Sequence, residues 1–235
     1  MLILTIEINN KDMPKKKAKL LSKRFITHDV KSFTVEKPSG YSFKPGQATM
    51  VALNKDGWLE EGRPFTFTSL NNDEVLEFVI KEYPDHDGAT KEIHKMKPGE
   101  EFLIGSPWGA IKYKGPGVFL AGGAGITPFI AIFRQLKEDQ ELKGNRLIFS
   151  NRAKRDIILE KELREMFSGD DLILTLTDDR EEGYDYGMID KEFLEENISD
   201  FSQNFYVCGP PAMVEDISKY LKELGADPEA VIFEE

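Results

Sequence analysis

Short apolar runs, rich in β-branched and aromatic residues, recur at regular intervals through the first half of the chain. Clusters of turn-forming residues separate them, for example Lys44-Pro45-Gly46 and Asn71-Asn72-Asp73. Short strands with this punctuation are typical of an antiparallel barrel or sandwich. One short helix is expected over 89–96. The predicted strands are 24–27, 32–35, 48–53, 64–70, 75–81 and 101–105.

The second half alternates between strand and helix patterns. An apolar strand pattern at 117–121 is followed by 128–136, where Phe129, Ile132 and Phe133 fall at helical spacing. Strands that alternate with helices predict a parallel, doubly wound α/β sheet. The predicted strands are 117–121, 146–150, 171–176, 204–208 and, as the last of five, 231–233, and the predicted helices are 128–136, 159–167, 191–196 and 213–224.

The two halves also differ in charge. The 235 residues carry a net charge of −11, yet residues 1–115 hold 18 of the 31 basic and only 16 of the 42 acidic side chains. The change falls at Lys114-Gly115-Pro116-Gly117, so we expect two domains, 1–114 and 115–235. An acidic chain is a poor general binder of nucleic acid, because phosphates need cationic partners.

Five lysines lie within 9–19, and we interpret this stretch as a mobile basic segment that precedes the barrel. A segment of this charge could also dock an acidic protein.

Cysteine content and apolar run lengths exclude several classes of protein. The single cysteine, Cys208, excludes an internal disulfide, a Cys-rich zinc site and a four-cysteine iron–sulfur cluster, and it fits a reducing compartment. The three histidines have no metal-ligand spacing, so we expect no metal site. No apolar run approaches the roughly 20 residues of a membrane helix, and the first residues lack a signal-peptide pattern. We therefore expect a cytoplasmic protein without a membrane span.

A glycine-rich turn, Gly122-Gly123-Ala124-Gly125-Ile126-Thr127-Pro128, follows a predicted strand and opens a predicted helix. This context is typical of a phosphate-binding turn, with Thr127 as the helix cap and Pro128 at the first helical position. A plain strand-to-helix turn is the alternative. The usual dinucleotide fingerprint is incomplete, because Pro128 replaces its third glycine and the next strand ends in Ser150-Asn151-Arg152 without a carboxylate. A standard Rossmann dehydrogenase is therefore disfavoured.

Three segments together resemble one family, the ferredoxin–NADP reductase superfamily. Arg63-Pro64-Phe65-Thr66-Phe67-Thr68-Ser69 resembles its Arg-x-Tyr-Ser/Thr-x-x-Ser flavin motif, and 123–128 resembles its nicotinamide-dinucleotide turn. Cys208-Gly209-Pro210-Pro211-Ala212-Met213 resembles its Cys-Gly-Pro-Pro-x-Met segment. The order and separations agree over about 18–233, and flavodoxin, ferredoxin and NADH–cytochrome reductases are similar. The resemblance implies a six-stranded antiparallel flavin barrel followed by a five-stranded parallel nucleotide domain.

On the flavin side, the resemblance implies that FAD is bound by the barrel. Arg63 would pair with the pyrophosphate, Phe65 would stack on the isoalloxazine where the family usually has Tyr, and the Thr66 hydroxyl would reach flavin N5. The expected flavin-binding residues are Arg63, Pro64, Phe65, Thr66, Phe78, Val79, Ile80, Lys81, Gly88, Ala89 and Thr90, of which 78–81 would act through backbone groups.

On the nicotinamide side, the resemblance places the Cys208 sulfur beside nicotinamide C4 and flavin N5, so Thr66 and Cys208 are the expected catalytic residues. Arg152 could hold the 2′-phosphate of NADPH, whereas Asp178 would repel it, and the motif 151–159 resembles NADH-using relatives. We favour NADH slightly. The expected nucleotide-binding residues are Gly123, Gly125, Thr127, Pro128, Arg152, Asp178, Cys208, Gly209, Pro210, Met213 and Phe233, with Phe233 as a candidate to stack over the flavin.

These observations predict an FAD-dependent NAD(P)H oxidoreductase that passes hydride from nicotinamide to flavin N5. Because the chain lacks a cluster of its own, the electron acceptor must be external: a ferredoxin, a flavodoxin, a haem protein or a small molecule. The alternative is a non-catalytic flavin- or nucleotide-binding electron-transfer subunit that requires a partner chain.

Overall fold

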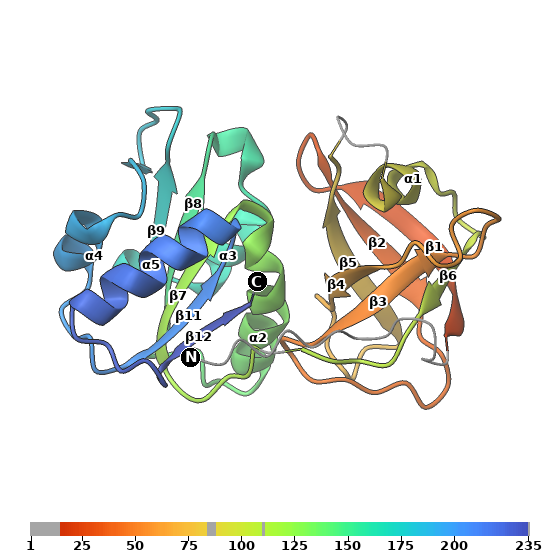
Figure 1. The fold of residues 1–235 in the computed structure, drawn as a ribbon, viewed down its shortest axis with the longest axis horizontal. Helices are drawn as coiled ribbons and strands as arrows, with labels where there is room; N and C mark the ends of the chain where they lie inside the picture. Colours follow the sequence, from red (N-terminus) through yellow and green to blue (C-terminus); the bar gives the residue numbers. More distant parts are fainter. Residues whose placement is uncertain (1–14, 84–87, 110, 235) are drawn as a thin grey trace.

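The computed structural model describes residues 15–83, 88–109 and 111–234, and they form two bodies side by side (Figure 1). The first body, red to yellow-green at the right, is a barrel. The second, green to blue at the left, is a sheet covered by helices on both faces. Among these residues no helix is long and apolar enough to cross a bilayer.

The barrel is a six-stranded antiparallel sheet in the order β4-β3-β6-β1-β2-β5. Its two edge strands, β4 and β5, approach each other, and the Thr68 amide donates to the Glu77 carbonyl at 2.9 Å, which nearly closes the sheet. Alternate side chains of the strands fill the interior. The elements are β1 (Lys16–Phe25), β2 (Val30–Glu36), β3 (Ala48–Leu53), β4 (Arg63–Thr66), β5 (Val75–Lys81), α1 (Ala89–Lys95) and β6 (Glu101–Ile104).

The basic stretch was predicted wrongly where the structure describes it. Lys16–Lys19 are not a mobile entry segment but the start of β1, paired with β6 from Lys16↔Ile104 to Lys19↔Glu101. Ala18 and Leu20 are fully buried while Lys17 and Lys19 point outward, which is the two-residue period of a strand. The density of lysines hid this alternation. Residues 9–14 lie outside the described residues.

The second body is a parallel sheet in the order β10-β9-β8-β7-β11-β12. Helices α2 and α3 pack on one face against residues such as Phe119, and α4 and α5 pack on the other against residues such as Leu120. This confirms the doubly wound fold. The elements are β7 (Gly117–Gly122), α2 (Thr127–Glu138), β8 (Arg146–Asn151), α3 (Glu160–Met166), β9 (Leu172–Leu176), β10 (Asp185–Tyr186), α4 (Lys191–Asn197), β11 (Asn204–Cys208), α5 (Pro211–Glu223) and β12 (Val231–Glu234).

This sheet has six strands, not the expected five. The additional strand, β10, is only two exposed residues long and pairs with β9 through Asp185↔Thr175 and Tyr186↔Leu176. A strand this short at the sheet edge has no apolar run, so the hydrophobic pattern could not indicate it.

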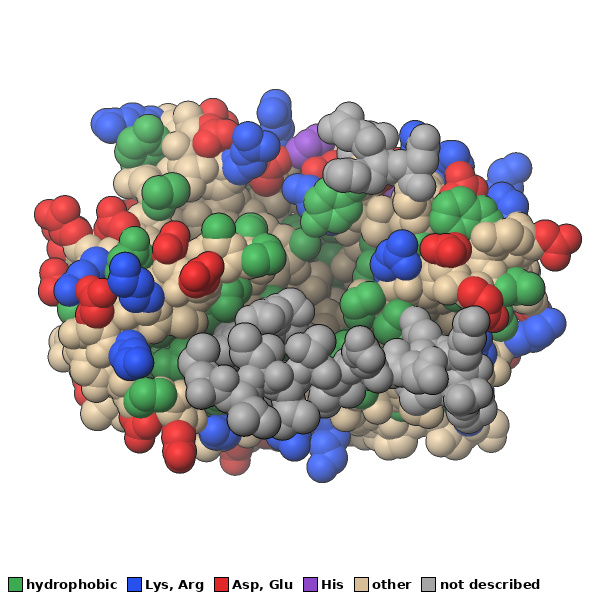
Figure 2. Space-filling model, in the orientation of Figure 1, with side chains coloured by type: hydrophobic (Ala, Val, Ile, Leu, Met, Phe, Trp, Pro, Cys, Tyr) green, Lys and Arg blue, Asp and Glu red, His purple; other side chains and the backbone are tan. Residues whose placement is uncertain are grey.

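Apolar packing joins the two bodies. Val30, Val79 and Ile111 from the barrel side belong to the same buried cluster as Ile132 and Phe133 of α2. The Tyr206 hydroxyl of β11 donates to the Gly115 carbonyl at 2.8 Å and accepts from the Lys114 amide at 2.9 Å, which holds the connecting segment in place. Hydrophobic side chains surround the hollow between the two halves of the molecule (Figure 2).

Candidate functional site

The carboxyl ends of β7 and β11 lie next to each other in the sheet, with Ala121 opposite Cys208. The chain continues from β7 to α2 and β8 on one side and from β11 to α5 and β12 on the other. A crevice forms where the direction of strand addition reverses in this way, and in open α/β sheets ligands bind there. The glycine-rich turn and the Cys208-Gly209-Pro210 segment therefore meet at the site predicted from the sequence.

Two glycines of the turn have different reasons to be glycine. A Cβ on Gly125 would clash with the Cys208 carbonyl and lie only 2.6 Å from the Gly209 nitrogen, so Gly125 lets the two turns pack backbone to backbone. Gly123 has a φ of +52° and nothing within 4 Å of an added Cβ. Its backbone therefore needs glycine's left-handed conformation and borders open space, as a ligand-facing turn requires.

Thr127 does not cap the helix as predicted. A 3₁₀ turn, Gly123–Ile126, precedes α2, so Thr127 already has helical dihedral angles and its hydroxyl donates to the Ala124 carbonyl at 3.0 Å. Pro128 consequently lies one position inside the helix start. The Thr127 amide donates to the Ala124 carbonyl and Pro128 has no amide hydrogen, so these two residues offer an anion no free donor. The open side of the crevice at this end is lined by the 3₁₀ turn, at Gly123, Ala124 and Gly125.

A cavity of about 580 Å³ opens at the crevice. It contains most of the expected nucleotide-binding residues, and Thr127, Pro128, Asp178 and Cys208 are outside its lining. Cys208 is half-buried at the end of β11, directly before Gly209. The lining residues are Lys81, Tyr83, Gly122, Gly123, Ala124, Gly125, Ser150, Asn151, Arg152, Asp156, Thr177, Gly209, Pro210, Pro211 and Met213.

Arg152 and Asp178 pair with each other at the rim of this cavity. Arg152 Nε lies 3.3 Å from Asp178 Oδ2, and both side chains are largely exposed. The Asp178 amide also donates to the Arg152 carbonyl at 2.9 Å, so the loops after β8 and β9 run together. The structure thus brings together the two residues with opposite expected effects on a 2′-phosphate.

Asn151, the last residue of β8, was not predicted as a ligand. Its side chain is 5% exposed, and neither Nδ2 nor Oδ1 hydrogen-bonds to any residue that the structure describes. A buried amide left unpaired costs about 1–3 kcal/mol. Asn151 lies at the strand end where the usual dinucleotide fingerprint has a carboxylate that binds the ribose. An amide in that place was the sequence signal that could have identified Asn151 as a ligand.

A second cavity, of about 570 Å³, lies on the barrel. Arg63, Pro64 and Phe65 of β4 form one side, and Gly88-Ala89-Thr90 at the start of α1 forms the other. The sequence placed all six in the flavin site. The Arg63 guanidinium is half-exposed, bonds to the Gly62 carbonyl at 2.9 Å and lies 3.7 Å from Glu61 Oε2. A weak exposed pair of this kind leaves it available for a stronger anion.

Tyr83 lines both cavities, so they adjoin. Its side chain is 47% exposed and follows the end of β5. Sequence reasoning missed this residue. No motif marks it, and only its place between the two cavities identifies it.

The segment from Phe78 to Lys81 contributes differently from residue to residue. Phe78 and Ile80 are buried in the barrel core, and Val79 packs in the interface cluster. Lys81 alone reaches the nucleotide cavity, and its Nζ lies 3.0 Å from Asp29 Oδ2. The resemblance places 78–81 in the flavin site through backbone groups; none of the four lines the barrel cavity, and that role stays a prediction.

The remaining predicted residues are placed by strand register. Thr66 is half-buried opposite Ala48, and Phe65 is partly buried against the barrel core. Phe233 pairs through its backbone with Val207, one position before Cys208. Its side chain is outside the described part of the structure.

Two adjoining cavities with these linings fit a flavin dinucleotide and a nicotinamide dinucleotide. Each has a helix start and a cationic side chain, Arg63 in one and Arg152 in the other. Gly123 offers a bare backbone, and Asn151 offers an amide donor and acceptor without a protein partner. These are features suited to phosphates and hydroxyls.

Comparisons with known proteins agree with this architecture. Residues 17–113 match the model of the oxidoreductase FAD-binding domain, and residues 119–219 match that of the oxidoreductase NAD-binding domain. NADH–cytochrome b5 reductase 1 of Arabidopsis thaliana is 30% identical over 231 residues, which cover 91% of this chain and 82% of that protein.

A second relative is the ferredoxin–NAD(P)(+) reductase component of the naphthalene 1,2-dioxygenase system of Pseudomonas putida. It is 26% identical over 87% of this chain, which spans 64% of the relative's length. A solved ferredoxin NADP⁺ reductase from Neisseria gonorrhoeae, with bound FAD and NADP, superposes with a TM-score of 0.82 at 22% identity, covering 94% of this chain and 98% of that one. With its FAD-binding domain followed by an NAD-binding domain, the chain belongs to the ferredoxin–NADP reductase superfamily of oxidoreductases.

Proposed function

We propose that this chain is an FAD-dependent NAD(P)H oxidoreductase that delivers electrons to an external acceptor, with 1–114 as the flavin domain and 115–235 as the nucleotide domain. The observation that carries the proposal is the pair of adjoining cavities that share Tyr83. When bound, FAD supplies the ability to take two electrons from a nicotinamide and release them singly. The protein's part is to bind, orient and shield the two rings.

On the flavin side, Arg63 and the first amides of α1 neutralise the pyrophosphate from two directions. The Lys91 and Glu92 amides donate to the Gly88 carbonyl, so the helix bonds its own amides only after its first positions. Phe65 would hold the isoalloxazine by contact, and the Thr66 hydroxyl would be a hydrogen-bond donor to it. Phe65 has no hydroxyl, so its contribution is contact area alone.

On the nicotinamide side, Gly123 and the start of α2 receive the pyrophosphate of the second nucleotide. Cys208 and Gly209 hold the nicotinamide against the flavin ring, with the Cys208 thiol as a positioning group and not as a nucleophile. Packing of Gly125 on this backbone supports that role, because it fixes where the Cys208 main chain lies.

NADH is the proposed donor. The Arg152 charge is already offset by Asp178, and the Asp178 carboxylate repels a phosphate placed beside it. The pair is exposed and holds Arg152 only weakly, so it is the negative charge of Asp178 beside the site that disfavours a 2′-phosphate relative to a ribose hydroxyl.

The acceptor is proposed from the relatives' names, which include a cytochrome b5 reductase and the reductase component of a dioxygenase system. The first name indicates a haem protein as the acceptor, and the second indicates a ferredoxin. A flavodoxin or a small molecule is the alternative. The chain itself supplies the flavin and nucleotide halves of such a system.

The test is anaerobic titration of the FAD-loaded protein with NADH and, separately, NADPH. We expect the visible flavin band to bleach faster with NADH, and ferricyanide to support continuous turnover. Arg63→Ala should weaken FAD binding and should leave the fold intact. Protein that takes up no FAD would refute the proposal, and bound FAD without turnover would favour an electron-transfer subunit that needs a partner chain.

A further inference from the structure

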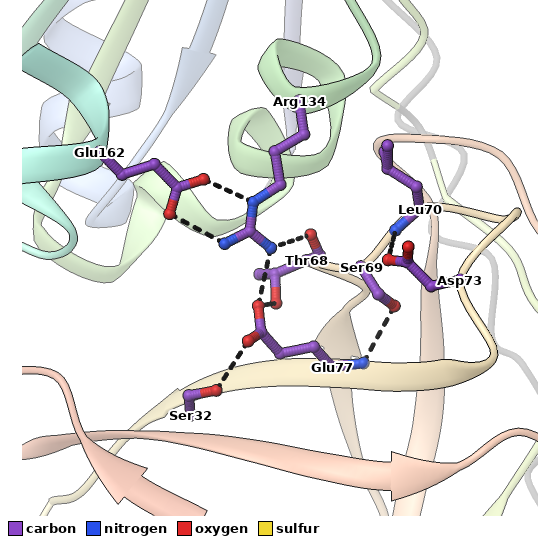
Figure 3. A network of polar contacts seen from close by, with 8 residues as sticks. All are labelled: Ser32, Thr68, Ser69, Leu70, Asp73, Glu77, Arg134 and Glu162. Carbon is purple, nitrogen blue, oxygen red and sulfur yellow. Dashed lines mark hydrogen bonds and ion pairs between the residues drawn. The ribbon is translucent and has the colours of Figure 1, made fainter. Parts of the chain in front are cut away.

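Arg134 makes a largely buried polar connection between the two bodies, its side chain being 21% exposed and that of Glu77 18% (Figure 3). Within its own body it holds Glu162 of α3 with both arms of the guanidinium, at 2.6 Å from Nε and 2.9 Å from Nη2. Across the interface Nη1 donates to Glu77 Oε1 at 2.8 Å and to the Thr68 carbonyl at 2.6 Å. One side chain of α2 thus binds both a neighbouring helix and the barrel.

The barrel partners are themselves fixed. Glu77 accepts hydrogen bonds from the hydroxyls of Thr68 and Ser32, at 2.8 and 2.9 Å, and its amide donates to Ser69 Oγ at 2.9 Å. Thr68 and Glu77 are also the pair that closes the barrel between β4 and β5. Arg134 therefore binds the barrel at the hydrogen-bonded pair that closes it, and not at a surface loop.

Both ends of the connection continue into the proposed site. Thr68 and Ser69 complete the segment that begins with Arg63 and contains Thr66. Arg134 lies two turns along the helix that starts at Thr127, directly after the glycine-rich turn. One guanidinium therefore connects the flavin motif with the helix that follows the nucleotide turn, beside the apolar contacts of Val79 and Phe133.

The electrostatics favour an intact connection. Burial alone would raise the pKa of the Glu77 carboxyl, but the Arg134 charge and the hydrogen bonds from Arg134, Thr68 and Ser32 outweigh it and leave the pKa below its ordinary value. The charged form of Glu77 is thus favoured, and Arg134 supplies the compensating positive charge. Removing one partner of such a pair leaves a buried charge uncompensated.

We propose that Arg134, through its bonds to Glu77 and Thr68, is a positioning residue that sets the distance and orientation between the nicotinamide and flavin rings. This rests on the proposed function. Reacting atoms must approach to about 3–3.5 Å, and a misplacement of about 1 Å can cost about 100-fold in rate. A rigid charge-assisted connection between the two motifs supplies that accuracy.

The test compares two matched substitutions, each of which removes one carboxylate from Arg134. Glu77→Leu removes the interdomain partner, and Glu162→Leu removes the partner within the nucleotide domain. In FAD-loaded protein we measure the single-turnover rate of bleaching by NADH, the affinity for NADH, and reoxidation by ferricyanide. In dithionite-reduced protein with NAD⁺ we measure the long-wavelength charge-transfer absorbance, which reports ring overlap. Hydrogen exchange at the Thr68 amide of the ligand-free chain follows the barrel closure that Arg134 contacts.

For Glu77→Leu we expect bleaching to slow by about tenfold or more, weaker charge-transfer absorbance and faster exchange at the Thr68 amide, with reoxidation unchanged. Glu162→Leu should leave bleaching within about twofold, and Glu77→Gln, which keeps an acceptor of the same length, should recover most of the rate. If Glu77→Leu does not fold, Arg134→Lys replaces it, because an ammonium keeps the charge but cannot bridge both carboxylates.

Equal slowing by the Glu77→Leu and Glu162→Leu variants, or an unchanged bleaching rate and absorbance in Glu77→Leu, would overturn the positioning role and leave the proposed function standing. Wild-type protein that neither binds FAD nor responds to NADH would overturn the proposed function itself.

Discussion

Replacing Gly125 with alanine should separate the two turns that form the nucleotide crevice. The new Cβ would lie 2.6 Å from the Gly209 nitrogen and nearer still to the Cys208 carbonyl, whereas ordinary contact begins at 3.4 Å, so the Cys208–Gly209 backbone must retreat by at least about 0.8 Å. Its neighbours are backbone atoms that cannot rotate away. Overpacking of this kind costs about 1–3 kcal/mol, and about 2 kcal/mol would lower the Tm by roughly 4–8 °C in a chain of this size.

Gly123→Ala is the matched control. Nothing lies within 4 Å of its added Cβ, so the only penalty is the left-handed backbone, about 1 kcal/mol for alanine. Both substitutions remove the same flexibility from the unfolded chain, so the difference between them isolates the clash. Thermal unfolding measures the stability, and NADH titration of the FAD-loaded protein measures the site.

We expect Gly125→Ala to be the less stable variant and to slow bleaching by NADH, because Cys208 moves with the displaced backbone. Gly123→Ala should raise the KM for NADH, because its methyl group points toward the ligand space. It should lower the Tm less than Gly125→Ala does. A Gly125→Ala variant with wild-type Tm and wild-type bleaching would show that the two turns are not packed as described.

Three further changes test other parts of the site. The pKa of the Glu77 carboxyl is lowered in the folded state, so the ionised carboxylate stabilises the fold above pH 4.5, and this stabilisation is lost as the pH falls through the lowered pKa. Glu77→Gln should therefore flatten the dependence of Tm on pH below about 4.5. Asn151→Leu should stabilise the ligand-free chain by about 1 kcal/mol, because it removes a buried unpaired amide, and should raise the KM for NADH; an unchanged KM would remove Asn151 from the site. Asp178→Asn should free Arg152 and lower the KM for NADPH relative to NADH, and steady-state rates with both donors would reveal a failure of this reasoning.

Local patterns in the sequence were enough to predict the two-body fold. The short apolar runs of β2, β3 and β5 and the helical spacing of Phe129, Ile132 and Phe133 are set by burial, and burial is strong at these positions. The wrong predictions lie where strand residues are exposed or where neighbouring lysines hide the buried positions. The two exposed residues of β10 carry no pattern, and the lysines of β1 obscure Ala18 and Leu20 between them.

The motifs predicted which segments form the site but not the details of each residue. The segments 63–69 and 123–128, chosen by their resemblance to family motifs, each contribute residues to the lining of one of the two cavities. It could not show that Thr127 lies inside the helix, because the 3₁₀ turn before it depends on how Gly125 packs against Cys208. Tyr83 has no motif of its own, and only the meeting of the two cavities identifies it.

Arg134 illustrates why some functional residues are invisible to sequence reasoning. It follows Phe133 on an amphipathic helix, where a charged residue normally indicates the solvent face. Its partners Glu162 and Glu77 are 28 and 57 residues away in the chain, so no window contains the network. The charge is largely buried because the barrel covers part of it, and that burial is a property of how the two bodies pack. A polar residue beside the apolar stripe of an interface helix is therefore a better candidate for interdomain positioning than for solvation, and the Glu77 and Glu162 variants decide between the two.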